Sequence, residues 1–267
     1  MKYVIHNHIL KFSRLALVAV GMSLATVSPA SAGTILLSAI EEDYTQHFGV
    51  LANTGLLNTL LPADWEMSAA TYDADSGGTS TGGMYSYGKN GQADRALGSL
   101  TDDVTGSLYF GAQFENGTAL TFGRLDIQYI GEQWRRGANA AADFLSFEYS
   151  FDASSLQDNT ADWDSVAELT FTSPATGSPA AAVNGNLTGF RTHRATTLTL
   201  TDPMAFGDKI WIRFRDDNLS GDDHGLAVDD FQITPLAAEV NVPEPATAVL
   251  LAMGLCGLAT FARRRRG

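Results

Sequence analysis

Cysteine is almost absent from this 267-residue sequence. Its one example, Cys256, lies near the C-terminus, and no cysteine precedes it. The chain before that residue therefore contains no disulfide, no thiolate metal site and no cysteine nucleophile. A domain of this kind is stabilised by its own hydrophobic core or by a metal ion, and this length is enough for an adequate core.

Positive charge is also scarce, with 17 Lys and Arg against 30 Asp and Glu. Seven of the 17 lie near the two ends, so residues 33–241 hold ten Lys and Arg against 29 acids, a formal net charge of −19. Such a surface repels phosphate backbones, which argues against nucleic acid as a partner. The excess of acid fits solubility outside the cell, divalent cation binding, or both.

Recognisable catalytic motifs are missing. Beyond residue 32, histidine occurs only at His47, His193 and His224, and there is no G-x-S-x-G or H-E-x-x-H pattern. We interpret His224 as a loop histidine bonded to a carboxylate rather than as a catalytic base. Acids are numerous enough for a glycosidase pair, but the separation of two carboxylates in space defines such a pair, and their number does not.

Long hydrophobic runs occur only at the two ends. At the N-terminal end, three basic residues precede an apolar run at 15–27, and Ala30 and Ala32 follow in an A-x-A arrangement. This order is typical of a secretory signal peptide. We therefore expect the export machinery and signal peptidase as partners, with residues 1–32 removed from the mature chain.

The second apolar run, residues 246–262, is uncharged and just long enough to cross a bilayer as one helix. A cationic cluster of the kind found on the cytoplasmic side of such spans follows it. The cluster consists of Arg263, Arg264, Arg265 and Arg266. Together the two ends predict a single transmembrane helix with residues 33–241 outside.

Pro243, Glu244 and Pro245 stand directly before this helix. With the apolar run and the arginine cluster, residues 242–267 resemble the PEP-CTERM sorting signal of Gram-negative bacteria. The resemblance implies recognition of the Pro-Glu-Pro element by an exosortase-type enzyme, with the arginines as the stop-transfer end. It also implies transient residence in the inner membrane and delivery to the cell surface or extracellular matrix. A permanent anchor is the alternative, because anchoring and processing begin with the same segment.

The body, residues 33–241, has the length of one domain and is dominated by strand patterns. Apolar and polar residues alternate in 143–151 and 209–215, as in half-buried strands. Further strands are expected at 107–114, 124–130, 167–172, 195–201 and 226–233. The body is therefore predicted to be an all-β antiparallel sandwich, most nearly a jelly roll.

Three other segments interrupt this pattern. Residues 44–61 are the one stretch of the body that could be helical. Residues 71–99, rich in Gly and Ser, and the acidic residues 157–165 are expected to form long loops, which often carry binding functions on sandwiches. Flexible surface excursions are the alternative interpretation of both loops.

Short motifs spread along the body occur in an order that resembles a module of secreted bacterial proteins. They are LPADW (61–65), YSYG (85–88), DRALG (94–98), GEQWR (131–135) and DHGLAVDD (223–230). The module is generally uncharacterised, so the resemblance implies an exported β-rich domain and brings no activity.

The densest acidic stretch, residues 215–233, contains Asp229 and Asp230. If strand alternation is regular, Asp229 shares the apolar face of Phe231, where a carboxylate needs a cation, an arginine or several donors. Ca²⁺ prefers such oxygen ligands. We predict a structural calcium site that joins the last strand to the first acidic segment. Its ligands would be Glu41, Glu42, Asp43, Asp229 and Asp230. The alternative is that Asp229 pairs with Arg213 or caps a turn.

Aromatic side chains suggest a second kind of site. Trp163 lies in the acidic loop, and Trp211 stands opposite the apolar residues of its strand, so both are candidates for exposed, ligand-binding rings. Flat aromatic faces beside Asp and Asn suit sugars. We therefore expect a non-catalytic surface or matrix protein that binds exopolysaccharide. The alternatives are a secreted hydrolase acting on carbohydrate or another polymer, and a purely structural or adhesive subunit.

Overall fold

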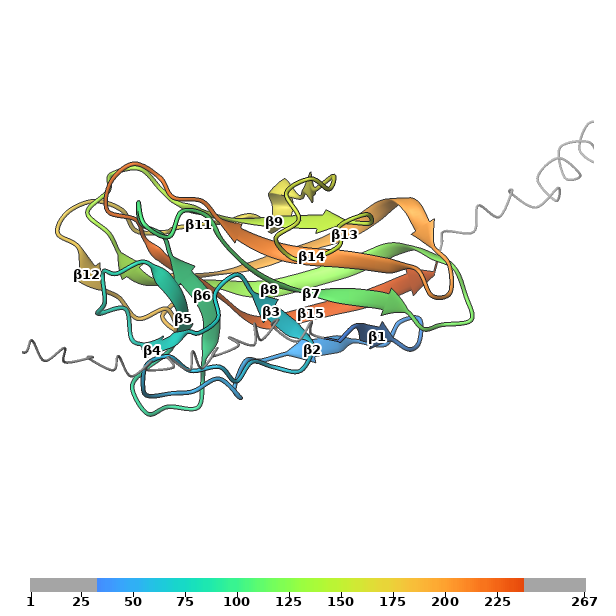
Figure 1. The fold of residues 1–267 in the computed structure, drawn as a ribbon, viewed down its shortest axis with the longest axis horizontal. Helices are drawn as coiled ribbons and strands as arrows, with labels where there is room; N and C mark the ends of the chain where they lie inside the picture. Colours follow the sequence, from blue (N-terminus) through green and yellow to red (C-terminus); the bar gives the residue numbers. More distant parts are fainter. Residues whose placement is uncertain (1–32, 238–267) are drawn as a thin grey trace, which may run out of the picture. The chain divides into compact units, whose positions relative to one another are not determined.

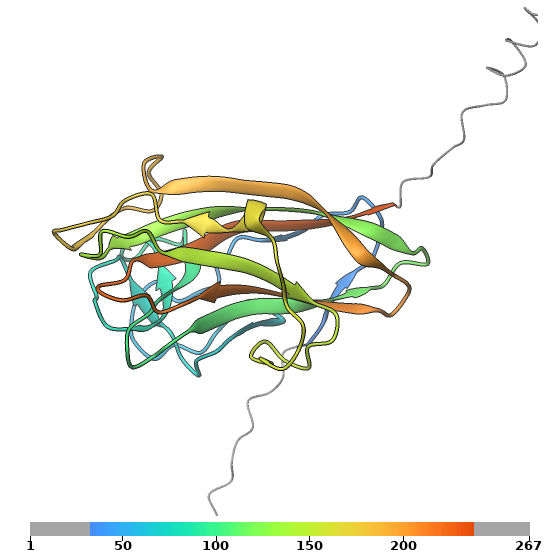
Figure 2. The same cartoon turned by 90° about the horizontal axis from the view of Figure 1, so that it is seen from above.

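The computed structural model describes residues 33–237 as two β-sheets packed face to face (Figures 1 and 2). The predicted signal peptide and sorting tail lie outside the described residues. Within residues 33–237 there is no α-helix, and no helix is long and apolar enough to cross a membrane. The all-β sandwich predicted from the sequence is confirmed.

The first sheet has seven strands and is antiparallel except where β1 meets β7. Its order is β1 (Ile35–Leu37), β7 (Leu108–Asn116), β14 (Lys209–Asp216), β9 (Phe144–Ser150) and β10 (Asp164–Ser165), with β3 (Trp65–Met67) beside β7 and β11 (Phe171–Thr172) beside β9. A single turn of 3₁₀ helix, Ala167–Leu169, precedes β11.

The second sheet has eight strands and is antiparallel except where β4 meets β5. Its order is β12 (Ala181–Ala182), β8 (Phe122–Arg136), β15 (Gly225–Ala237), β6 (Ala96–Leu100), β5 (Gly83–Tyr87) and β4 (Asp73–Asp75), with β13 (Arg191–Met204) beside β8 and β2 (Tyr44–Gln46) beside β15. Among the longer strands from β7 onward, the chain alternates between the two sheets, which is the winding expected of a jelly roll.

Aromatic rings from both sheets fill the space between them. The ring of Phe214 lies 5.2 Å from that of Phe110 and 5.5 Å from that of Phe147, measured between centroids. From the opposite sheet, Tyr129 approaches Phe214 edge-on at 5.0 Å, and Phe231 lies 6.2 Å away. Such pairs are favourable beyond the area that they bury, so this cluster holds the sheets together.

The strands predicted from alternation are present, most of them longer than predicted. Residues 167–172 differ, because a 3₁₀ turn occupies their first half. The helix considered at 44–61 is wrong. Residues 44–46 form β2, and Phe48 and Leu57 adopt positive φ angles that a helix does not allow. Leu56 and Leu57 are each 72% exposed, whereas Phe48 and Leu51 enter the main core, so the apolar residues of this segment do not share one buried helical face.

Residues 71–99 are not the long loop that their Gly and Ser content suggested. They contain β4, β5 and β6, which complete one side of the eight-stranded sheet. Tyr85 and Tyr87 are buried in a second apolar cluster with Trp134 and Ala227, separate from the main core. Both faces of these strands are therefore covered, which removes the alternation that would have marked them in the sequence.

Candidate functional site

An open pocket of about 530 Å³ lies on the outer face of the seven-stranded sheet. Strand alternation places it there, because residues 210, 212 and 214 of β14 enter the core and residues 211, 213 and 215 face outward. The loop between β9 and β10 covers part of this face and contributes Asn159, Ala161 and Trp163. The other lining residues are Tyr109, Glu148, Ser165, Arg213 and Arg215. We call this the Trp163 pocket.

Arg213 organises the floor of the Trp163 pocket. Its guanidinium carbon lies 3.6 Å from the centroid of the Trp163 ring and 4.7 Å from that of Tyr109. Nε and Nη2 of Arg213 each lie 2.7 Å from Oε2 of Glu148, and Nη1 donates to the carbonyl of Leu156. The Arg213 side chain is 3% exposed and that of Glu148 is 6% exposed, so this ion pair is shielded from water. A cation between two aromatic faces holds those rings in place.

Trp163 itself is half-buried, so part of the indole remains accessible. Its Nε1 donates to the carbonyl of Asp158, which fixes the ring to its own loop. Hydrogen bonds from Thr160 and Ser154 to the Asp158 carboxylate lower the pKa of that group. The loop that presents Trp163 is therefore ordered by its own polar contacts. The structure places this predicted residue in a pocket.

Trp211 was expected to be exposed, and that expectation was wrong. The residue does face outward from β14, but it is only 5% exposed. Ala153 and Leu156 of the β9–β10 loop pack over it, together with Tyr109. Alternation could identify the face of the sheet but not the loop that covers it. Trp211 supports the pocket from below and does not present its ring to a ligand.

A second group of interest surrounds Asp229, one of the predicted calcium ligands. Leu226, Val228 and Phe231 all lie in the main core, so the alternation shifts by one residue between 228 and 231. The register of β15 against β8 shifts at the same place, and Asp230 there has a φ of 49°. This β-bulge turns Asp229 to the outer face, opposite Phe231, which corrects the orientation expected from regular alternation.

On that outer face Asp229 lies diagonal to Glu132 of β8. Burial raises the pKa of Asp229 to about 8 and that of Glu132 to about 7. The negative charges of Asp94 and Asp230 add to both increases, and that of Glu132 adds to the increase at Asp229. Glu132 accepts a hydrogen bond from Trp134 through one oxygen, and its other oxygen is buried without a partner among the described residues. At neutral pH both groups are therefore protonated in a substantial fraction of molecules.

Of the other predicted calcium ligands, Asp230 lies on β15, and residues 41–43 form the turn between β1 and β2. Asp230 contacts Nδ1 of His47 at 2.7 Å, and Asp43 accepts a hydrogen bond from Thr234. Glu42 accepts one from Ser38, and the backbone N–H of Glu41 donates to the carbonyl of Pro235. The last strand, β15, pairs with β2, whereas the first strand, β1, pairs with β7 in the other sheet, so the first and last strands are not the neighbours that the prediction assumed.

Residues 33–237 contain no group of three His, Cys, Asp or Glu side chains arranged to hold a metal ion. Arg213 pairs with Glu148 and not with Asp229, so that alternative partner is also ruled out. Calcium binding stays a prediction. Titration of chelator-treated protein with Ca²⁺ tests it, because a bound ion raises the melting temperature.

His224 lies in the loop before β15, as interpreted from the sequence, but it is fully buried and its ring contacts backbone groups rather than a carboxylate. Its Nδ1 accepts the backbone N–H of Gly137, and its Nε2 faces the carbonyl of Ala141 at 3.1 Å. The backbone N–H of His224 donates to Asp143. These contacts tie the loop between β8 and β9 to the loop between β14 and β15, and a ring enclosed in this way has no access to a substrate.

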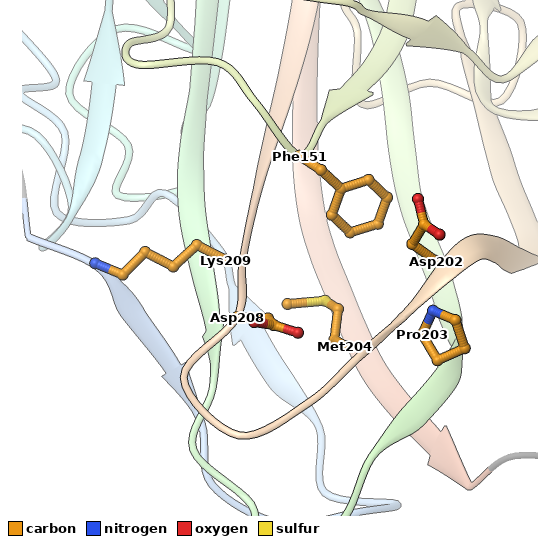
Figure 3. Close-up of a pocket in the computed structure, with 6 residues that line it drawn as sticks. All are labelled: Phe151, Asp202, Pro203, Met204, Asp208 and Lys209. Atoms are coloured by element: carbon orange, nitrogen blue, oxygen red, sulfur yellow. The ribbon is translucent and has the colours of Figure 1, made fainter.

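A smaller pocket of about 260 Å³ lies beside the turn between β13 and β14. Figure 3 shows Phe151 and Asp202 facing it and Lys209 extending away from the other residues. Lys209 pairs with Glu115, and Asp208 accepts a backbone N–H of its own turn. This pocket has fewer oriented polar groups than the Trp163 pocket, so we place the candidate site at Trp163.

Comparison with protein families finds the PEP-CTERM protein-sorting motif at residues 241–266. This confirms the sorting signal predicted from Pro243, Glu244, Pro245 and the terminal arginines. The chain is therefore an exported protein of the kind that exosortase-type machinery sorts to the cell envelope. No curated protein matches the chain.

Solved structures resemble the body only distantly. A xylan-binding domain of family CBM22 is 8% identical, with a TM-score of 0.35 over 66% of this chain and 90% of that one. The K3 adhesin domain of Lys-gingipain from Porphyromonas gingivalis is 17% identical, with a TM-score of 0.39 over 65% and 92%. Tailspike protein 4 of bacteriophage CBA120 is 10% identical, with a TM-score of 0.33 over 65%, and the chain spans only 19% of it. At these TM-scores the likenesses carry no functional argument.

Proposed function

We propose that this exported protein acts at the cell surface or in the extracellular matrix as a non-catalytic polysaccharide-binding module, and that the Trp163 pocket is its binding site. One observation carries the proposal. A half-buried tryptophan, stacked on Arg213, lines a pocket that also presents the polar side chains of Asn159, Ser165 and Arg215.

Sugar rings combine apolar C–H faces with hydroxyl groups, and the Trp163 pocket offers a partner for each. The accessible part of the indole provides a flat apolar surface. Asn159, Ser165 and Arg215 surround it with donors and acceptors. Because Arg213 and the Asp158 carbonyl already hold the indole, little side-chain entropy is lost when a ligand binds.

The carboxylates of the pocket argue for binding rather than hydrolysis. A glycosidase of the usual kind needs two carboxyl groups that flank the bond to be cut. Glu148 is the one acid among the residues lining the Trp163 pocket, and its Oε2 is held by two nitrogens of Arg213. A carboxylate committed to a buried ion pair is a poor proton donor or nucleophile.

A glycan array probed with the mature protein and two variants tests this proposal. Trp163→Ala should abolish retention, because it removes the apolar surface of the pocket. Phe206→Ala removes another aromatic ring, that of a residue 72% exposed in the turn between β13 and β14. This variant should leave retention unchanged. Retention that survives Trp163→Ala, or the absence of retention by any glycan, would contradict the proposal.

A further inference from the structure

Arg215 is the cation of the Trp163 pocket whose guanidinium N–H groups can still donate hydrogen bonds to a ligand. Its Nε donates to Oδ1 of Asp217 at 2.8 Å. Its Nη1 lies 3.6 Å from Oε1 of Glu148, beyond hydrogen-bonding distance, and its side chain is 36% exposed. Arg213, by contrast, is buried and uses all three of its nitrogens. The terminal edge of the Arg215 guanidinium is therefore the part of this pair that a ligand can reach.

The Trp163 pocket differs from this acidic molecule as a whole in its balance of charged residues. Residues 33–241 contain only ten Lys and Arg, and two of them line this one pocket. Glu148 is their one acidic neighbour in the lining, so cationic residues outnumber acidic ones there, on a body of net charge −19. Asp217, which holds Arg215 at Nε, is not one of the lining residues.

Two neighbouring guanidinium nitrogens match the two oxygens of a carboxylate, and this geometry is the usual reason for an arginine at a carboxylate site. Ser165 and Asn159 add neutral hydrogen-bonding groups around the same opening. Trp163 lines the same pocket and provides the surface for a sugar ring.

We propose that the Trp163 pocket selects carboxylated sugars, the uronic-acid units of an acidic polysaccharide, and that Arg215 contacts their carboxylate. This inference rests on the proposed function and specifies its ligand class. The negative body repels an acidic polymer at long range, but salt screens this repulsion beyond about 8 Å at physiological ionic strength. A contact at hydrogen-bond distance is screened much less, so selection operates at the pocket itself.

Calorimetric titration of the mature protein with matched oligosaccharides tests the inference. The probes are trimers of galacturonic, glucuronic and mannuronic acid, each paired with its carboxyl-reduced, neutral counterpart, at about 0.15 M salt. The protein should bind at least one acidic trimer about tenfold or more tightly than its neutral counterpart, the ratio expected for one charge-assisted hydrogen-bonded pair. Arg215→Gln should remove this preference, and Arg215→Lys should restore only part of it.

Arg136→Gln is the matched control, because it removes one positive charge from the other sheet, where Arg136 contacts the carbonyl of Pro179. It should leave the preference unchanged. Equal binding of acidic and neutral trimers, or a preference that survives Arg215→Gln, would overturn the carboxylate inference and leave polysaccharide binding standing. Binding of neither kind, combined with no retention on any glycan array, would overturn both.

Discussion

The ion pair between Arg213 and Glu148 contributes both to the stability of the fold and to the geometry of the Trp163 pocket. A buried pair is costly to break, because the remaining charge is left without a partner in a poorly hydrated environment. We expect Glu148→Ala to lower the free energy of unfolding by about 3–5 kcal/mol, and chemical denaturation measures this loss.

Arg215→Ala serves as the control, since its side chain is partly exposed and exposed ion pairs contribute about 1 kcal/mol or less. If the two substitutions lower the free energy of unfolding equally, the ion pair between Arg213 and Glu148 is accessible to water, and Arg213 does not organise the pocket.

Glu132 and Asp229 predict a dependence of stability on pH. In an unfolded chain these carboxyl groups ionise near pH 4, whereas burial raises their pKa values to about 7 and about 8 in the folded protein. The folded state thus binds more protons between about pH 4 and pH 8, and stability should fall as the pH rises through this window. One pKa unit corresponds to about 1.4 kcal/mol, so the two shifts together correspond to a loss on the order of 10 kcal/mol across the whole window.

Thermal melts from pH 5 to pH 9 measure this effect. Glu132→Gln and Asp229→Asn should flatten the pH dependence and raise the melting temperature at pH 9. Glu168→Gln, which neutralises an exposed acid, should not flatten it. The account is contradicted if all three variants keep the slope of the parent protein.

At the scale of elements, two glycines of the segment 71–99 differ in whether the packing of the strands requires a glycine. A Cβ added at Gly98 of β6 would lie 2.1 Å from the carbonyl oxygen of Leu226 in β15, and a strand backbone cannot give way easily. A Cβ at Gly78 would meet nothing within 4 Å. We expect Gly98→Ala to cost about 1–3 kcal/mol and Gly78→Ala to cost little, as measured by urea denaturation.

Equal stability of these two variants would mean that β6 does not pack against β15 as described. The comparison is strict because both changes add the same methyl group within the same Gly-rich segment.

The sequence predicted the elements that have one apolar face. Strands β9 and β14 show a clear alternation, because most of their outward residues are polar even where a loop covers them; Phe144 and Trp211 are the exceptions. Strands β5 and β6 were missed, since the main core and the cluster around Tyr87 bury both of their faces. Residues 44–61 were considered as a helix, although several of their leucines are exposed.

The candidate site could be predicted only in part for related reasons. Trp163 was identified from its place in an acidic loop, but its partners Arg213 and Glu148 come from strands distant in sequence. Pairing across strands depends on register, which alternation alone does not determine. The bulge at Asp230 had no clear marker either, because the positive φ there falls on aspartate rather than glycine.

For the whole molecule, the sorting motif at residues 241–266 places this acidic sandwich in the export route, and the predicted signal peptide would begin that route. Intact mass of protein recovered from the cell surface and medium should show an N-terminus at Gly33 and, if the tail is processed, a loss of the residues after the Pro-Glu-Pro element. Recovery of the full mass of 267 residues from the cytosol would contradict the export route.

Polysaccharide binding at Trp163 is the central claim, and one titration tests it most directly. Mature protein is titrated with the surface polysaccharide purified from the cells that produce it. We predict saturable binding that Trp163→Ala abolishes and Phe206→Ala preserves. Saturable binding of equal strength by the Trp163→Ala protein, or no binding by the unaltered protein, would contradict the claim.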